Sequence, residues 1–346
     1  MSSSPLRTRV SAPAAATPVA FARAIVDAYE RYGKDPADAL RQAQITPVIL
    51  GRVDTRITAS QMERLSTAAM QELDDEALGA FSRKLPWGSY GMLARASLSS
   101  PSLEVALKRW CRHHGLLAAE LALKVQVSAT SAVVTADLAP APSRNPEFAL
   151  VHVLRNLHGL ACWFIDSRIP LLEARFPFPA PPHAAVYRLL FGGTLKFEAP
   201  QAAIRFDARY LALPLRRDEK ALRQMLQRAL PLTVLPYRRD RLLVAQVRRA
   251  IAGQPAATHG AGGVAALLNV SVRTLHRQLH EEGASLQQLK DEVRRERATD
   301  LLYRSAMPLK QIAQAVGFHN EKSFGRAFRG WTGLSPGEFR RNPGRP

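Results

Sequence analysis

The chain has 346 residues and a formal net charge of +19, with 48 Lys and Arg against 29 Asp and Glu. It is long enough for two domains with substantial cores. No uninterrupted apolar run of about 20 residues occurs, so we expect no transmembrane helix and no membrane association. The positive charge favours a polyanionic partner such as DNA, although a high-GC genome rich in Arg codons would also raise it.

Residues 1–20 are small, Pro-rich and without the apolar core of a signal peptide, which predicts a disordered leader. The globular pattern begins at Phe21. We expect a first domain over residues 21–230, a Pro-bounded linker over 231–236 and a second domain over 237–346.

The first domain mixes helical and alternating patterns. Thr58 followed by Gln61 is a capping box, and Leu121 to Val127 alternates apolar with polar residues, as a half-buried strand does. The expected elements are helices starting near Phe21, Pro36, Thr58 and Ser100, strands over 121–127 and 132–138, a helix over 148–164, and strands over 172–178 and 204–206. Helices combined with paired strands predict an α+β fold.

The second domain contains a helix-turn-helix pattern over residues 308–340. Ile312, Ala313 and Val316 share one helical face, and Gly317 can end the first helix in the left-handed conformation. Asn320 is a good N-cap for the second helix. An ordinary helical hairpin with a solvated charged face is the alternative interpretation.

An imperfect upstream repeat favours the helix-turn-helix. Residues 264–268 match 312–316, and Ser271 takes the place of Asn320 after a one-residue difference in the turn. Between the two units, residues 285–303 form an amphipathic helix of roughly 30 Å. Because successive major-groove faces lie about 34 Å apart, such a helix can hold two reading helices in adjacent grooves of one duplex. The whole domain is therefore expected to be all-α.

The exposed faces of both second helices carry residues suited to base edges and phosphates. They are Arg273, His276 and Arg277 in the first unit, and Glu321, Lys322, Gly325 and Arg326 in the second.

Residues 264–341 resemble the DNA-binding domain of the AraC/XylS transcription regulators, in the strings SVRTLHRQLHEEG, EVRRERATDLL and IAQAVGFHNEKSFGRAFRGWTGLSPGEFRR. The resemblance implies that the seven residues named above read bases. One departure is the pair Gly262-Gly263, where helix formers are usual. Each Gly costs about 1 kcal/mol relative to Ala, so this helix is expected to start late or to fray.

Two strings of the first domain, Trp87–Trp110 and Tyr187–Leu215, resemble the arabinose-binding-like regulatory domain of one AraC-family branch. The resemblance implies a domain that senses a small molecule or mediates self-association, but the label assigns no ligand. The aromatic candidates for an effector pocket are Trp87, Tyr90, Trp110, Trp163 and Tyr187, since pockets are mostly apolar and aromatic. Core packing is the alternative role for most of them.

No motif of a hydrolase, phosphate loop, zinc protease or dinucleotide site occurs, so we expect no catalytic residues, no metal site and no cofactor. The neighbouring histidines, His113 with His114 and His152 with His158, lack ligand spacing. Cys111 and Cys162 have no metal-type spacing, and inert thiols fit a cytoplasmic protein. A DNA-repair methyltransferase would need a reactive cysteine in a setting that neither of them has.

The sequence thus predicts a cytoplasmic, sequence-specific DNA-binding transcription regulator controlled by a small-molecule effector. Double-stranded DNA is the expected partner, with RNA polymerase and a second copy of the chain as further candidates. The alternatives are a DNA-repair or metabolic enzyme that carries a DNA-binding domain, and a protein-interaction module.

Overall fold

The computed structural model describes residues 17–139, 145–227 and 242–341, except 256, 259 and 283. The chain divides into two compact units, residues 1–238 and 239–346. The predicted linker over 231–236 lies outside the described residues.

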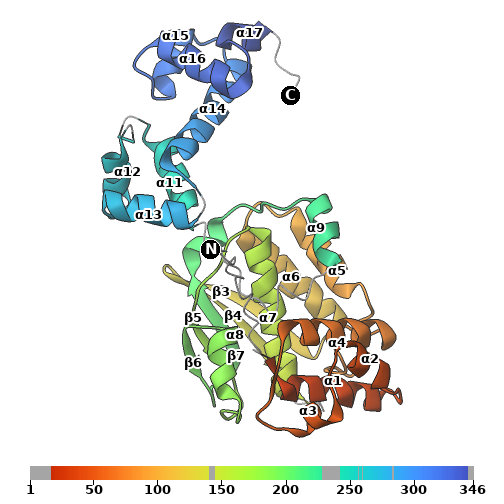
Figure 1. The fold of residues 1–346 in the computed structure, drawn as a ribbon. Coiled ribbons are helices and arrows are strands. Elements are labelled where there is room, and N and C mark those ends of the chain that lie inside the picture. Colours follow the sequence, from red (N-terminus) through yellow and green to blue (C-terminus); the bar gives the residue numbers. More distant parts are fainter. Residues whose placement is uncertain are drawn as a thin grey trace, which may run out of the picture. The chain divides into compact units, whose positions relative to one another are not determined.

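The first unit is built around a five-stranded sheet in the order β3-β4-β7-β5-β6 (Figure 1). All neighbours are antiparallel except β5 and β6. The strands are β3 Leu121–Val127, β4 Ser131–Leu138, β5 Leu171–Arg175, β6 Thr194–Lys196 and β7 Ala202–Asp207, and a separate pair is formed by β1 Thr17–Pro18 and β2 Arg56–Ile57.

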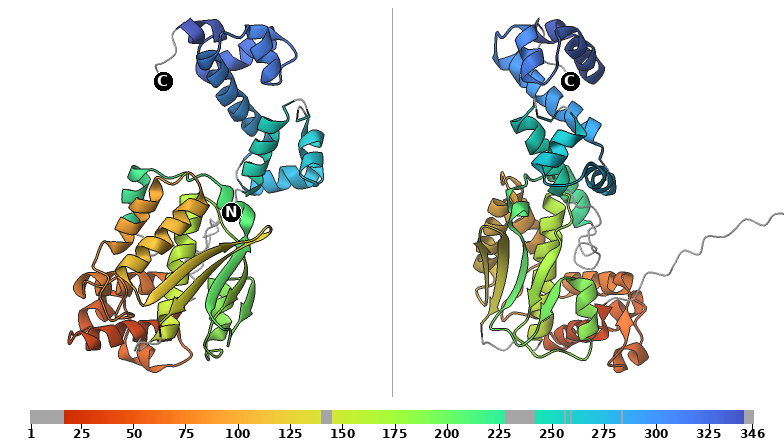
Figure 2. Two further views of the ribbon diagram at one scale, coloured as in Figure 1. Left: turned by 180° about the vertical axis from the view of Figure 1, so that it is seen from behind. Right: turned by 90° about the vertical axis from the view of Figure 1, so that its left-hand side faces the viewer.

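Helix α7 (Pro146–Phe164) packs against β4 and β7 and carries much of the core (Figures 1 and 2). Its fully buried residues include Leu154, Leu160 and Phe164. The other helices of the unit are α1 Val19–Arg31, α2 Ala37–Gln42, α3 Pro47–Gly51, α4 Ala59–Glu72, α5 Ser89–Leu98, α6 Leu103–Leu117, α8 Tyr187–Leu190 and α9 Glu219–Leu226, with short 3-10 helices at Ala184–Val186 and Ala208–Ala212. The expected α+β fold is confirmed.

Residues 17–20 differ from the prediction of a disordered leader over 1–20. Thr17 and Pro18 pair with β2, and Val19 is fully buried at the start of α1. The last four residues of the expected disordered leader are therefore part of the fold. They are held there because Thr17 and Pro18 pair with a strand about 40 residues along the chain. Residues 1–16 lie outside the described residues.

The second unit contains only helices among its described residues: α11 Leu242–Gly253, α12 Ala261–Leu267, α13 Val272–Glu281, α14 Leu286–Arg304, α15 Leu309–Ala315, α16 Glu321–Thr332 and α17 Pro336–Arg341. It has two small cores. Leu286, Leu289 and Val293 of α14 belong to the first core, and Ala298 and Leu302 belong to the second. Helix α14 thus contributes to the cores of both helix-turn-helix units and connects them, as the sequence predicts.

Candidate nucleic-acid interface and internal cavity

The first helix of the downstream unit, α15, is followed by a glycine in the left-handed conformation. Gly317 has φ 82°, and the next amide, of Phe318, donates to the Ala313 carbonyl at 2.8 Å. Asn320 then caps α16, its side-chain oxygen accepting the Ser323 N–H at 2.8 Å. Phe324 and Phe328 of α16 are fully buried, which fixes the side of α16 that faces outward.

The upstream unit has the same turn with a different residue at its centre. Asn269 has φ 52°, where the downstream unit has glycine, and asparagine tolerates this conformation best among residues with a side chain. The Val270 N–H donates to the Ala265 carbonyl at 3.0 Å, and the Ser271 hydroxyl accepts the Thr274 N–H at 3.1 Å. The repeat in the sequence is therefore a repeat in backbone geometry.

The first helix of the upstream unit begins at Ala261 and contains both Gly262 and Gly263, so the expected late start is wrong. A Cβ on Gly263 would lie 1.8 Å from the Ala257 carbonyl oxygen, whereas nothing lies within 4 Å of a Cβ on Gly262. Gly263 is thus needed for a close approach of the backbone, and the lower helix propensity is the accompanying cost.

The predicted reading residues lie on the outward faces of α13 and α16. Arg273, His276 and Arg277 are exposed on α13. On α16, Glu321, Lys322 and Arg326 are exposed and Gly325 is half-buried, with open space where a Cβ would lie. Each unit therefore presents a mainly basic face opposite its own core.

The basic residues of α14 do not act as one surface. The Arg294 guanidinium lies over the Phe318 ring at 5.0 Å, and burial lowers its pKa. Arg297 donates to the Ala252 carbonyl at 3.1 Å, and Arg295 is exposed. Arg248 of α11 pairs with Glu292 and Glu296 of α14. Arg294 thus holds α14 to the turn between α15 and α16, and Arg297 holds it to α11.

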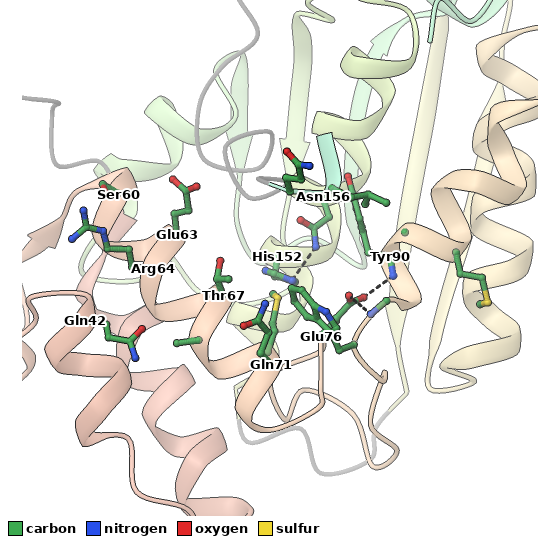
Figure 3. Close-up of a pocket in the computed structure, with 18 of the residues that line it drawn as sticks. Gln42, Ser60, Glu63, Arg64, Thr67, Gln71, Glu76, Tyr90, His152 and Asn156 are labelled. Carbon is green, nitrogen blue, oxygen red and sulfur yellow. Dashed lines mark hydrogen bonds between the residues drawn. The ribbon is translucent and has the colours of Figure 1, made fainter. Parts of the chain in front are cut away.

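The first unit contains a cavity of ≈ 1080 Å³ between α4, α5 and α7 (Figure 3). Its wall combines aromatic with charged and amide side chains, the mixture typical of small-molecule sites. The lining includes Gln42, Ser60, Glu63, Arg64, Thr67, Gln71, Glu76, Trp87, Tyr90, Met92, Arg95, His152, Asn156, Leu226 and Gln227.

Three hydrogen-bonded contacts shape the inner wall of this cavity. The Glu76 carboxylate accepts the N–H groups of Gly88 at 2.8 Å and Tyr90 at 2.6 Å, at the start of α5. His152 and Asn156 of α7 are joined by a 2.9 Å contact between Nε2 and Nδ2 (Figure 3). Burial lowers the pKa of His152 to about 4, so its imidazole is neutral near pH 7.

The five aromatic candidates separate into two groups. Trp87 and Tyr90 line the cavity, and Trp110 lies behind Tyr90, in edge-on contact with it at 5.3 Å between ring centroids. Trp163 instead packs under the Arg217 guanidinium. Tyr187 is fully buried among phenylalanines, and its hydroxyl donates to Glu147 at 2.6 Å. Trp163 and Tyr187 are therefore core residues.

Sequence reasoning missed the polar lining, above all Glu76, Arg64, His152 and Asn156. The apolar face of α4 was predicted, but nothing in the pattern tells whether its opposite face meets solvent or a cavity. The cavity is formed by segments far apart in the chain, so no local signal could have identified these residues.

Two family models match the chain. The one described as "Arabinose-binding domain of AraC transcription regulator, N-term" matches residues 33–215, more than half of the chain. The chain belongs to the AraC family of transcription regulators. The model described as "Helix-turn-helix domain" matches residues 264–342.

Two of the similar regulators match over nearly their whole length, and a third matches over a short segment. The ornithine utilization regulator of Pseudomonas aeruginosa is 27% identical over 94% of this chain and 96% of that protein. VirS of Mycobacterium tuberculosis is 26% identical over 91% of this chain and 93% of its own. VqsM of Pseudomonas aeruginosa is 42% identical over 21% of this chain and 22% of that protein. This AraC-family chain is a DNA-binding transcription regulator.

The AraC family is a family of transcription regulators, which are generally not enzymes. Cys111 and Cys162 are buried, and burial raises the pKa of Cys111 to about 12, which keeps this thiol protonated. Within the described ranges, no three His, Cys, Asp or Glu side chains gather as metal ligands. Across the same ranges, every helix is too short or too polar to span a bilayer.

Proposed function

We propose that this regulator reads one DNA site with α13 and α16 in adjacent major grooves, and that a small molecule in the cavity of the first unit controls this binding. The duplicated helix-turn-helix with α14 shared between its two cores is the observation that carries the proposal. Helix α14 has 19 residues, about 28 Å at 1.5 Å per residue, close to the roughly 34 Å between successive groove faces.

The reading roles follow from chemistry. Arg277 and Arg326 can each contact guanine through two hydrogen bonds, Arg273 and Lys322 can contact guanine or phosphate, and Glu321 can accept from cytosine. An imidazole such as that of His276 can donate from one ring nitrogen and accept at the other. Gly325 leaves room for close approach of the α16 backbone to DNA, because open space surrounds the position of a Cβ there.

Effector control is supported by the size and mixed chemistry of the cavity. The name of one relative refers to ornithine utilization, which makes ornithine the first compound to test here. For regulation, the effector must bind two states of the protein with different affinity. RNA polymerase and a second copy of the chain are the further partners that we propose for an active complex on DNA.

The test begins with the operator. Sequences bound by the purified full chain are selected from random duplexes, and affinity for the selected site is measured with and without metabolites of the neighbouring genes' pathways. We expect one site read by both units and at least one compound that changes its affinity. Turnover of a metabolite without DNA would favour the enzyme alternative, and binding of a macromolecule by the first unit alone would favour the interaction module.

A further inference from the structure

The inner end of the cavity has a chemistry of its own. A small side pocket of ≈ 40 Å³ shares Glu76, Tyr90, His152 and Asn156 with the main cavity and continues to Trp110 and His114. On this measure one water needs roughly 10–15 Å³, so the side pocket has room for a small head group but not for a ring.

Two buried polar atoms at this inner end have no hydrogen-bond partner. They are the Tyr90 hydroxyl and Nδ1 of His114, and the His114 side chain is only 5% exposed. An unsatisfied buried polar group costs about 1–3 kcal/mol. Two of them beside one small pocket make it a place where a small polar group of a ligand can supply hydrogen bonds in place of water.

The titratable side chains at the inner end include Glu76, His114 and His152. Burial, and then the neighbouring Asp75 and Asp74, raise the pKa of Glu76, against the two N–H groups that it accepts. Burial lowers the pKa values of His114 and His152 to about 4, so neither is cationic near pH 7. In the part of the chain that the structure describes, no basic side chain is recorded in an ion pair with Glu76.

The cations of the cavity belong to other parts of its wall. Arg64 projects from α4, across the cavity from Glu76 and Tyr90 (Figure 3). Arg95 pairs with Glu219 at 2.9 Å. An anionic head group would therefore be drawn to the α4 wall and repelled from the inner end, whereas a cationic head group would be drawn inward.

We propose that the inner end binds the protonated primary amine of the effector, with Glu76, Tyr90 and His114 as acceptors for its three N–H groups. An ammonium has three donors and no acceptor, which matches a carboxylate, a phenol oxygen and an imidazole nitrogen. Trp87, which is 46% exposed, lines the cavity and offers a face that also attracts cations. This inference rests on the proposed effector site and names the chemical class of its ligand.

The probes are four amines, each compared with two partner compounds of the same skeleton, one with a trimethylammonium group and one with a hydroxyl group in place of the terminal amine. The amines are 1,5-diaminopentane, 5-aminopentanoate, L-lysine and phenethylamine. Trimethylation keeps the charge and removes every N–H donor. Binding to the full chain is measured by calorimetry, and operator affinity is measured in parallel.

Two substitutions localise the amine. Glu76→Gln should weaken binding of the best amine at least tenfold. Glu104→Gln, at a half-buried carboxylate on α6 that pairs with Lys108 outside the cavity, is its control. Tyr90→Phe should weaken it at least threefold and leave the melting temperature of the free protein unchanged or higher, because the lost hydroxyl has no partner. Tyr303→Phe, an exposed tyrosine on α14, is the control for this change.

We expect at least one amine to bind, and to bind at least tenfold more tightly than its two partners. Binding of no amine, equal binding of the partners, or unchanged affinity in both Glu76→Gln and Tyr90→Phe would overturn the amine assignment. A hydroxyl or carboxylate compound that binds the cavity and shifts operator affinity would overturn it while leaving effector control intact. An amine that binds through Glu76 without changing operator affinity would support the assignment and remove effector control.

Discussion

The role of α16 is tested most cleanly by Arg326→Ala. The Arg326 side chain is exposed, and its helix is held by Phe324 and Phe328 on the opposite face. Removing an exposed side chain from a helix changes stability by about 0.5 kcal/mol or less. Losing a bidentate contact with guanine costs about 1–3 kcal/mol. At about 1.36 kcal/mol per factor of ten, affinity for the operator should fall roughly 5-fold to 150-fold.

The assay is fluorescence anisotropy with the selected operator and with variants of each base pair. Arg326→Ala should lose affinity for the operator and also lose the preference at one position. Arg41→Ala, on an exposed ion pair of α2, removes the same charge from the first unit and should leave both unchanged. Equal losses in the two variants, or a uniform loss across all operator variants, would refute direct reading by Arg326.

Three further predictions concern the contact with phosphates, the stability of the second unit and the stability of the first unit. Operator affinity should fall about a thousandfold or more between 50 and 200 mM salt if six phosphates are contacted. An operator affinity that does not change with salt would exclude a phosphate interface. Gly262→Ala should stabilise the second unit by up to about 1 kcal/mol. Gly263→Ala should destabilise it, because its Cβ would lie 1.8 Å from the Ala257 carbonyl oxygen. Denaturant unfolding that ranks the two variants the other way would contradict the close approach of the backbone. Because burial lowers the pKa values of His114 and His152 from 6.5 to about 4, the unfolded chain takes up protons first as pH falls. The free energy of unfolding of the first unit should be highest above pH 6.5 and should fall towards pH 4, by up to about 2 kcal/mol per histidine at pH 5. A free energy of unfolding that does not change with pH would contradict the burial of these histidines as neutral groups.

Local patterns were sufficient for most of the secondary structure. The capping box of Thr58 and Gln61 is present at α4, and the predicted strands pair with Val125 opposite Val134. The helix-turn-helix was predictable because its turn depends on residues within one short segment, such as Gly317 and Asn320. Periodicity and capping are properties of neighbouring residues, so a single sequence reveals them.

Features that depend on distant segments were not predictable. Strand β6 has three residues, and it exists because β5 lies beside it in parallel. The Gly263 helix was expected to start late, since propensity alone does not reveal the close Ala257 carbonyl. Aromatic character identified Trp87 and Tyr90 as lining but also suggested Trp163 and Tyr187, because a core and a pocket attract the same side chains.

The central claim is that two helices read adjacent grooves of one duplex at a distance fixed by α14. Hydroxyl-radical footprinting of the operator with the full chain measures this most directly. We predict two protected segments one helical turn apart on one face, with Arg277→Ala weakening one and Arg326→Ala the other. Inserting either 5 or 10 base pairs between them should abolish simultaneous protection, because α14 cannot lengthen. A single protected segment, or double protection that survives a 10-base-pair insertion, would contradict the account.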